Sequence, residues 1–465
     1  MKQVNKWEDY LYDEDEEDVR MIAKRRRHTM HAAYAAASIA STAMSTPKRK
    51  GRKPGAKTKK RVRLDVDKVF ETMDDRHFRR KYRMDKDSFY NLLYIIKEHL
   101  PKTGEERGCV PNGAITHSAR LSMALRVAAG GDVLDIADYH GVNDDEAMAS
   151  FWFVVDAINN TPQLNIVFPD SHEEQEHLAA EFKEKSDIGI ACCIGAIDGI
   201  LIWIHKPTEA NCAAMGVGPV KFFCGRKKKY GLNMQAICDS RRRFLWVDIR
   251  FPGATSDYFA FEQTELFEKL QTDGFLRPGL CIFGDAAYVN APYMCVPFRN
   301  VAGSDGSKDA YNFFQSQLRI NIECAFGMLV HRFGILRKPF PVNVSVGKVN
   351  AAVLALCKLH NFCIDSNHEE IYTADVRDTG NIMMDGGMIL PRIDNNEGDY
   401  YWDYDTEQDR LEGLLDGGDH FDDVSRGVRR RYRRMVDLPV HLIHQHVIDT
   451  GARRPERNRR RRRSV

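Results

Sequence analysis

Apolar residues recur at helical spacing through the first part of the chain, between residues 65 and 160. One face of the segment DKDSFYNLLYIIKEHL collects the apolar residues Phe89, Leu92, Leu93, Ile96 and Leu100. Positions three and four residues apart share a face of an α-helix, so this spacing predicts an amphipathic helix. Asp87 or Ser88 is placed to cap its N-terminus. The pattern predicts a helical domain over residues 65–160.

A second helical stretch, THSARLSMALRVAAGGDVLDIADYHGVNDDEAMASFWFVVDAI, contains a Gly-Gly break and an HGVN turn. Gly141 is predicted to end one helix and Asn143 to cap the next, which is the rhythm of a helix-turn-helix. The following helix opens with Asp144, Asp145 and Glu146. Acidic side chains suit a helix N-terminus but oppose phosphate contact at the start of a recognition helix. We therefore expect a helix-turn-helix-like domain with a structural or weak DNA-binding role.

The pattern changes after residue 188 to short apolar runs. Five of these runs predict strands: IGIACCIGAID, LIWIH, GLNMQAICD, FLWVDIRFPG and LCIFGDAAY. Two later segments, TSDYFAFEQTELFEKLQ and RINIECAFGMLVHRFGIL, have helical spacing instead. Strands first, followed by alternating strands and helices, indicate a mixed α/β domain over residues 188–365.

Charged residues are segregated towards the two ends of the chain, although the formal net charge is only +2. Residues 8–18 are acidic, residues 21–63 hold 14 Lys and Arg and no acid, and the chain ends in an Arg-rich run. Basic blocks favour nucleic acid as a partner, although a single block is commonly a solvated tail. We expect a disordered acidic-then-basic tail over residues 1–63, serving nuclear import or minor-groove contact. Residues 366–465 are expected to be polar and partly disordered, with Arg-rich segments.

Cysteine usage and hydropathy narrow the class of protein. The 11 cysteines are scattered without a CxxC pair, which argues for a reducing compartment rather than a disulfide framework. No run reaches about 18 apolar residues, so no membrane span is expected. Cys357, His360 and Cys363 have ligand-like spacing but lie on an apolar helix, where a packed face is favoured over a zinc site.

Three acidic residues stand in apolar surroundings, where an acid is costly unless it is paired or binds a metal. Asp198 interrupts the run IGAIDGILIWI, Asp285 follows the predicted strand CIFG, and Glu323 lies inside an apolar helix. Each has a structural alternative: a hairpin turn for Asp198, an Asx turn for Asp285 and a solvent-facing position for Glu323. Because ligands usually bind at strand ends of an open α/β sheet, the three together favour a shared site.

These carboxylates predict divalent-metal chemistry, because no Ser-His or Cys-His nucleophile set is recognisable. Carboxylate oxygens suit Mg²⁺ or Mn²⁺ better than zinc. Two such ions, about 3.5–4 Å apart, can activate a water or a DNA 3′-hydroxyl and stabilise the leaving oxygen of a phosphodiester. The basic run that is predicted to neutralise the phosphate backbone of DNA consists of Arg226, Lys227, Lys228 and Lys229.

Six motifs occur in a fixed order along the chain: IGAIDG, RKKKYGLNMQAICD, FPGATSDYFAF, GDAAY, IECAFGMLVHRFGIL and ALCKLHNFC. In this order they resemble the PIF/Harbinger-type transposases and the Harbinger transposase-derived nucleases of the DDE endonuclease superfamily. The resemblance runs from about residue 85 to residue 365 and is densest after Ile190. It implies an RNase H-like fold and a metal-dependent DNA endonuclease or transposase. The implied DDE triad is Asp198, Asp285 and Glu323.

Further expectations follow from the resemblance. Asp257 matches the Gly-x-x-x-Asp segment of the family, and a helix N-cap is favoured for it over a supporting role at the site. Ile200 and Leu201 stand where the family usually has Thr-His, which weakens any side-chain role there. Such transposases generally act with a separate Myb-like DNA-binding protein, and assembly of the chain as a homo-oligomer is left open.

Two classes of function compete. The first is a nuclear, divalent-metal-dependent enzyme that cleaves and joins phosphodiester bonds at transposon ends. The second is a domesticated DNA-binding or scaffold protein that keeps the nuclease fold without catalysis. Loss of a triad acid would favour the second class, and all three acids are present. A helix-turn-helix regulator would need a basic recognition helix, which the sequence lacks.

Overall fold

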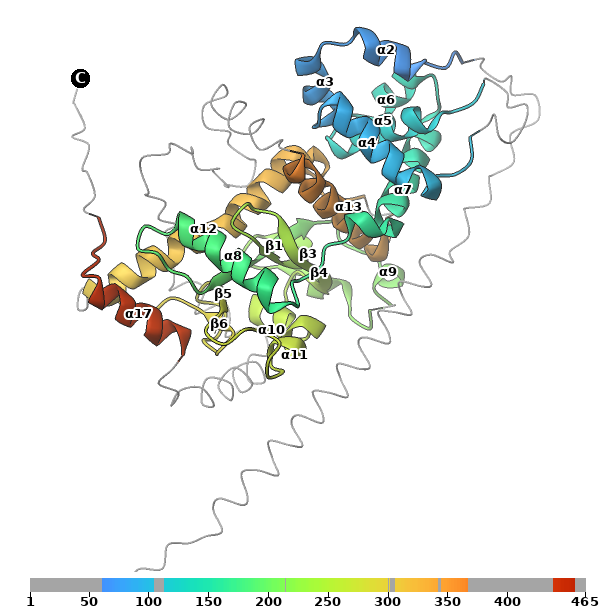
Figure 1. The fold of residues 1–465 in the computed structure, drawn as a ribbon. Helices are drawn as coiled ribbons and strands as arrows, with labels where there is room; N and C mark the ends of the chain where they lie inside the picture. Colours follow the sequence, from blue (N-terminus) through green and yellow to red (C-terminus); the bar gives the residue numbers. More distant parts are fainter. Residues whose placement is uncertain are drawn as a thin grey trace, which may run out of the picture.

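The described part of the chain consists of a helical part and a mixed sheet covered by helices (Figure 1). The computed structural model describes residues 61–103, 113–213, 215–299, 301, 306–341, 344–366 and 438–455. The N-terminal tail expected over residues 1–63 lies almost entirely outside the described residues, as does most of the region 366–465.

Short helices with acidic caps open the helical part. Its elements are α2 (Val66–Thr72), α3 (Asp75–Tyr82), α4 (Lys86–Ile96), the 3-10 turn η1 (Lys97–His99), α5 (His117–Ala128), α6 (Val133–His140) and α7 (Asp144–Asn160). The carboxylates of Asp65, Asp74 and Asp85 accept hydrogen bonds from backbone N–H groups in the first turns of α2, α3 and α4. The expected cap at Asp87 or Ser88 is therefore wrong, because both residues lie inside α4.

The turn between α6 and α7 has the predicted helix-turn-helix rhythm. Gly141 ends α6 with a φ of 63°, and Asn143 accepts a hydrogen bond from the backbone N–H of Glu146 at the start of α7. A Cβ atom on Gly141 would lie 1.8 Å from the carbonyl oxygen of Val62. Glycine is therefore required both by the left-handed backbone and by the close approach of the chain that enters the helical part.

The described residues form a six-stranded mixed sheet. Its strands are β1 (Cys193–Trp203), β2 (Phe223–Cys224), β3 (Lys229–Cys238), β4 (Phe244–Pro252), β5 (Cys281–Phe283) and β6 (Met294–Cys295). β3 pairs antiparallel with β1, β2 and β4, whereas β1, β5 and β6 run parallel. This arrangement confirms the predicted mixed α/β fold and is consistent with an RNase H-like core.

β1 is one continuous strand, whereas the sequence pattern predicted two. Asp198 pairs with Ala236, and Gly199 pairs with Gln235, in the middle of the ladder between β1 and β3. The alternative of an Asp-Gly hairpin turn is therefore wrong. Because the backbone groups of the Asp-Gly pair lie within a ladder, the strand passes through a polar residue and continues.

Helices pack on both faces of the sheet (Figure 1). The covering helices are α8 (His172–Lys185), α10 (Asp257–Glu262), α11 (Glu265–Leu270), α12 (Gly306–Arg332) and α13 (Val346–Asp365). Consecutive residues of β1 point to opposite faces: Ala196 joins the apolar cluster that contains α12 and α13, and Ile197 joins the cluster with α8, α10 and α11. Shorter elements lie between the larger ones: η2 (Pro162–Leu164), α9 (Glu209–Ala213), η3 (Pro219–Phe222) and η4 (Gly334–Arg337).

Two helical predictions need correction. The segment TSDYFAFEQTELFEKLQ forms α10 and α11 rather than one helix. Thr264 separates the two, because its Oγ1 accepts a hydrogen bond from the backbone N–H of Phe267 and so starts α11. The second correction is α12, which begins at Gly306 and is longer than the segment predicted from its apolar spacing. None of the helices in the described ranges is long and apolar enough to cross a membrane.

α13 joins the helical part to the sheet, since it packs against both α7 and β4. The buried ammonium of Lys358 donates hydrogen bonds to the carbonyl oxygen of Asn159 (3.0 Å) and to Oδ1 of Asn165 (2.9 Å). Asn159 in turn donates through Nδ2 to the carbonyl oxygen of Ala351 (2.8 Å). Oxygen atoms replace the water that a buried ammonium loses, so this junction is held by polar as well as apolar contacts.

A further helix, α17 (Pro439–Asp449), lies in the region expected to be polar and irregular. It packs against α12 and β6. The buried side chains of this segment are Leu438, Val440, Ile443 and Val447. Histidines alternate with these apolar residues in the sequence, which hides the helical spacing of the apolar face.

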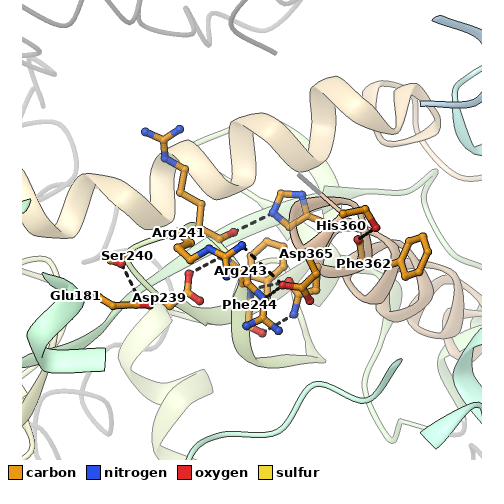
Figure 2. A network of polar contacts seen from close by, with 12 residues as sticks. Glu181, Asp239, Ser240, Arg241, Arg243, Phe244, His360, Phe362 and Asp365 are labelled. Carbon is orange, nitrogen blue, oxygen red and sulfur yellow. Dashed lines mark hydrogen bonds and ion pairs between the residues drawn. The ribbon is translucent and has the colours of Figure 1, made fainter. Parts of the chain in front are cut away.

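The turn between β3 and β4 is tied to α8 and α13 by polar contacts (Figure 2). The buried carboxylate of Asp239 accepts a hydrogen bond from the backbone N–H of Arg243 (2.8 Å), and Arg243 Nε pairs with Asp365 Oδ1 (3.0 Å). His360 Nε2 lies 2.9 Å from the carbonyl oxygen of Arg242. His360, like the cysteines one turn to either side of it, is fully buried, so the packed helix face predicted for these three residues is confirmed.

We predict that Asp239 makes the protein less stable as the pH rises from about 4 to 7. Burial raises the pKa of the Asp239 carboxyl to about 6, against the opposing hydrogen bond and charge of Arg243. Because this folded-state pKa exceeds the unfolded value of about 4, the stabilising contribution is fully present below pH ~4 and lost as the pH rises through ~6. Asp239→Asn cannot lose stability in this way. The difference in unfolding free energy between Asp239→Asn and wild type, measured with urea, should therefore rise by about 2 kcal/mol in favour of the variant between pH ~4 and ~7.

The matched control is Asp273→Asn, which changes an exposed aspartate in the loop after α11. Its stability should follow that of the wild type at every pH. A difference between Asp239→Asn and wild type that does not change with pH would contradict this account of Asp239.

Candidate active site

The register of the sheet brings Asp198 and Asp285 to neighbouring positions. Ala196 of β1 lies opposite Phe283 of β5 in a parallel pair, and each acid follows two residues later in its own segment. Residues two apart in extended chain face the same side, and neighbouring strands lie about 4.8 Å apart. The two carboxylates therefore meet on the face of the sheet that α12 covers.

The electrostatics of Asp198 reflect this crowding. Burial raises the pKa of Asp198 well above its ordinary value, and the negative charge of Asp285 raises it further. The charge of Arg319 on α12 opposes both effects. Asp198 Oδ1 also accepts a hydrogen bond from the backbone N–H of Gly199 (2.8 Å), which orients the carboxylate. A carboxylate held here needs a cation nearby to stay ionised at neutral pH.

Asp285 forms the Asx turn that was its structural alternative, and it also lies beside Asp198. Its Oδ1 accepts a hydrogen bond from the backbone N–H of Ala287 (2.9 Å). Burial raises the pKa of Asp285, and this hydrogen bond together with the charge of Arg319 opposes the rise. A carboxylate has about four acceptor positions, so the Asx turn leaves the second oxygen available to a cation.

Glu323 is held by an arginine on its own helix. Arg319 Nη1 lies 2.5 Å from Glu323 Oε1, and the side chains are 17% and 28% exposed respectively. The residues are four apart, so they stand one above the other on the face of α12. The solvent-facing alternative is wrong for Glu323, because its carboxylate is partly buried, paired, and close enough to Asp198 to raise the pKa of that residue.

A fourth carboxylate, that of Asp257, comes from the start of α10. Asp257 is the first residue of the helix, and Ser256 occupies the N-cap position, so the predicted N-cap is wrong. Its Oδ1 accepts hydrogen bonds from Asn233 Nδ2 (3.0 Å) and Gln235 Nε2 (2.8 Å). The hydroxyl of buried Tyr288 donates to Gln235 Oε1 (2.5 Å). This network fixes Asp257 beside β1. It therefore favours a supporting role for Asp257 at the site over the helix N-cap that the sequence pattern favoured.

The missing side chain of Gly199 makes room for Asp257. A Cβ atom on Gly199 would lie 2.1 Å from Asp257 Oδ1 and 2.5 Å from Gln235 Nε2. Because consecutive residues of a strand point to opposite faces, Asp257 approaches β1 from the face opposite Asp198. Burial raises the pKa of both Asp198 and Asp285, and the negative charge of Asp257 nevertheless raises both further.

The predicted basic run forms the turn between β2 and β3. Arg226, Lys227 and Lys228 are exposed there, and Lys228 has a φ of 55°. The charge of Arg226 lowers the pKa of Asp285, and the charge of Asp198 counteracts the lowering of the Lys227 pKa by desolvation and by Arg226. These effects place the cations of the turn within electrostatic reach of the carboxylates.

The last cation of the run is oriented differently. Lys229 Nζ lies over the ring of Trp203, 3.1 Å from its centroid, so it is held at the edge of the sheet by a cation–π contact. The sheet therefore presents three exposed cations beside its acids and anchors the fourth on the end of β1.

Within the ranges that the structure describes, no group of three or more His, Cys, Asp or Glu side chains is arranged to hold a metal ion. Glu323 is turned to Arg319 instead. The donor chemistry nonetheless fits a hard divalent cation, because Asp198, Asp285 and Glu323 offer carboxylate oxygens. Such oxygen donors suit Mg²⁺ or Mn²⁺ better than zinc, and one of the three carboxylates, that of Glu323, is already paired with an arginine.

Sequence reasoning missed Arg319 and the polar residues that hold Asp257. Arg319 could have been found, because it stands one helical turn before Glu323, at the spacing of an ion pair on one helix face. Asn233 and Gln235 alternate with buried apolar residues in β3, so they point to one face of a buried strand. That alternation is a detectable signal for a polar network, but its partner Asp257 is far away in the sequence.

Comparisons with known proteins match the part of the chain that carries these residues. Residues 197–361, from β1 to α13, match the family model described as DDE superfamily endonuclease. The chain is 25% identical over 311 residues to Protein Antagonist of Like Heterochromatin Protein 1 of Arabidopsis thaliana, covering 63% of this chain and 74% of the relative. It is 20% identical over 311 residues to Protein ALP1-like of Arabidopsis thaliana, covering 64% and 73%. No solved structure matches the chain significantly. These matches confirm the resemblance that the order of motifs indicated.

We predict that Gly199→Ala displaces Asp257 and destabilises the protein by about 1–3 kcal/mol, because the added methyl group overlaps a side chain fixed by two hydrogen bonds. Urea unfolding measures the change. The control is Gly218→Ala, since a Cβ atom at Gly218 would meet nothing within 4 Å. Equal stability of the two variants would show that Asp257 does not depend on the gap at Gly199.

Proposed function

Because residues 197–361 match the DDE superfamily endonucleases, we propose that this chain is a divalent-metal-dependent DNA endonuclease of the DDE type. The observation that supports the proposal is that Asp198, Asp285 and Glu323, from β1, the end of β5 and α12, all lie within electrostatic reach of Arg319, beside an exposed basic turn. In the wider form of the proposal, the enzyme cleaves and joins phosphodiester bonds at transposon ends.

Asp198, Asp285 and Glu323 are proposed to hold Mg²⁺ or Mn²⁺, with two ions expected. When bound, such ions would supply Lewis-acid activation of the attacking oxygen and stabilisation of the leaving oxygen. Asp198 and Asp285 sit on adjacent segments of a rigid sheet, which limits the movement of two of the ligands. Asp257, held by Asn233 and Gln235, supports the backbone of β1 at Gly199, next to Asp198.

The basic turn addresses a problem that the acids create. A cluster of carboxylates repels the phosphates of DNA, so a nuclease of this kind needs cations near its site. Arg226, Lys227 and Lys228 are exposed at the turn between β2 and β3, within electrostatic reach of Asp285 and Asp198. We propose that they bind the DNA backbone and hold a phosphodiester close to the carboxylates.

The competing function is a non-catalytic protein that keeps the nuclease fold. One relative is named as an antagonist of Like Heterochromatin Protein 1, which favours a role in chromatin through protein contacts. The pairing of Glu323 with Arg319 is the structural observation that fits this alternative. Cleavage of DNA carrying terminal repeats in the presence of Mg²⁺ separates the two functions.

A Myb-like DNA-binding partner is proposed to supply sequence recognition. α7 begins with three consecutive acids and is capped by Asn143, so its N-terminus is poorly suited to phosphate contact. The cleavage assay should therefore be run with and without an added Myb-like protein, and size-exclusion chromatography with light scattering would show whether the chain forms a homo-oligomer. Activity that needs no added protein, at a site of defined sequence, would remove the need for a partner.

We predict that Asp285→Asn lowers Mg²⁺-dependent cleavage of terminal-repeat DNA by at least about a hundredfold, because the variant keeps the shape of the side chain but removes one ligand charge. DNA binding measured by fluorescence anisotropy should be kept, since the proposed phosphate contacts come from the basic turn. The matched control is Asp309→Asn on α12, which changes an aspartate paired with Arg454.

A second variant should weaken DNA binding and keep the capacity for cleavage. Lys227→Gln with Lys228→Gln removes two exposed cations, so the slope of log affinity against log salt should fall by about two and binding should weaken. Cleavage by this variant should recover at saturating protein. Wild-type cleavage by Asp285→Asn in Mg²⁺ would exclude a DDE nuclease with this residue as a ligand.

We propose a nuclear location, supported by the basic residues of the N-terminal tail and by the heterochromatin protein named in a relative. Deleting residues 1–60, which spares the contacts of Val62 and Arg63 with Gly141, should lower nuclear accumulation of a fluorescent fusion. It should also flatten the salt dependence of DNA binding, because fewer counterions are released.

The control for the deletion is the same chain with residues 46–60, which carry the second basic run, restored at its N-terminus. Restoration should recover both properties. Normal nuclear accumulation and an unchanged salt slope in the deleted chain would show that the tail serves neither purpose.

A further inference from the structure

Arg319 occupies an unusual position for an arginine. It projects from α12 one turn before Glu323, with Nη1 2.5 Å from Glu323 Oε1 and only 17% of its side chain exposed. Burial by itself would lower the pKa of this guanidinium, but the charges of Glu323, Asp198 and Asp285 outweigh burial and raise it. Three acids from three separate elements therefore share one protein cation.

This placement has a consequence for folding without metal. Carboxylates gathered in a partly buried site repel one another, and each is costly to bury without a partner. A guanidinium stays protonated at any physiological pH, so its charge compensates the acids permanently. Arg319 therefore lowers the cost of holding Asp198, Asp285 and Glu323 close together in the metal-free protein.

The same placement opposes metal binding. A divalent ion would compete with Arg319 for the carboxylate oxygens that the guanidinium now neutralises, and the two cations would repel each other beside Glu323 Oε1. Arg319 cannot lose its proton to make way, so it must move. The side chain is long and is anchored to Glu323 by an i, i+4 contact, which a rotation of side-chain bonds can break.

We propose that Arg319 is a built-in counter-ion that stabilises the metal-free site and must release Glu323 before the metal site can form. The proposal rests on the function proposed above, since it assumes that these carboxylates are metal ligands. Arg319 acts here as a positioning residue through Glu323. Its charge sets how much metal is needed to assemble the site.

The test measures Mn²⁺ binding and stability in the full-length protein. Arg319→Gln should bind Mn²⁺ roughly tenfold more tightly in a titration followed by electron paramagnetic resonance, because a neighbouring positive charge is gone. In EDTA the same variant should melt at a lower temperature than wild type, and Mn²⁺ should raise its melting temperature by more than it raises that of wild type.

Two further variants make the result specific. Arg319→Lys keeps the charge on a shorter side chain, so its Mn²⁺ affinity should lie between those of wild type and Arg319→Gln. If Arg319→Gln does not fold, Arg319→Lys still tests the proposal, because its Mn²⁺ affinity should exceed that of wild type. The matched control is Arg454→Gln, which breaks a comparable arginine–aspartate contact with Asp309 (3.1 Å) on the same helix. Asp309 stands 14 residues before Glu323, about 21 Å along α12, so Mn²⁺ affinity should not change.

Unchanged or weaker Mn²⁺ binding by Arg319→Gln, or weaker binding than wild type by Arg319→Lys, would overturn the proposal. Asp285→Asn distinguishes a failure of the counter-ion role from a failure of the metal site. If it abolishes Mn²⁺ binding while Arg319→Gln does not tighten it, the metal site stands and the counter-ion role fails. If neither wild type nor Arg319→Gln binds Mn²⁺, both fail together.

Discussion

Repulsion among carboxylates is the constraint on which the rest of the candidate site depends. Asp198, Asp285 and Glu323 are drawn together by the sheet and by α12, and Asp257 adds a fourth negative charge from behind β1. Such a cluster is unstable unless cations compensate it. Arg319 provides compensation from within the site, and the basic turn adds positive charge at its edge. The acids and cations therefore form one electrostatic unit, and the function proposed for the site uses both signs of charge.

The sheet positions this unit by register rather than by side-chain packing alone. The parallel pairing of β1 with β5 aligns two of the acids, and the antiparallel pairing of β1 with β3 puts Gln235 opposite Gly199. Glycine at that point lets the carboxylate of Asp257 lie against the strand. A one-residue slip in either pairing would send these side chains to the wrong face. The continuous ladder through β1 is thus as important to the site as the acids themselves.

The helical part is attached to the sheet through specific contacts. Lys358 of α13 donates to Asn159 and Asn165, and Gly130 lies against Gly334 so closely that a Cβ atom would be 3.0 Å from the Gly334 backbone. These contacts fix the helix-turn-helix-like turn relative to α12 and α13. A partner bound to the helical part, as proposed for a Myb-like protein, would therefore act on a body joined to the sheet that carries the candidate site rather than on a freely tethered module.

The sequence by itself determined the fold class, the change from helical to mixed α/β segments, the helix-turn-helix rhythm at Gly141 and the packed face around His360, because local spacing and turn residues specify these features. The acids Asp198, Asp285 and Glu323 were predictable as candidates, since each stands among apolar neighbours. Tertiary structure alone decided that Asp198 and Gly199 continue a strand instead of turning, since pairing with β3 outweighs the local turn preference of Asp-Gly. It also decided the partners of Asp257, which lie 24 and 22 residues earlier in the chain at Asn233 and Gln235. Contacts across such separations depend on strand register and helix placement, which no local pattern contains.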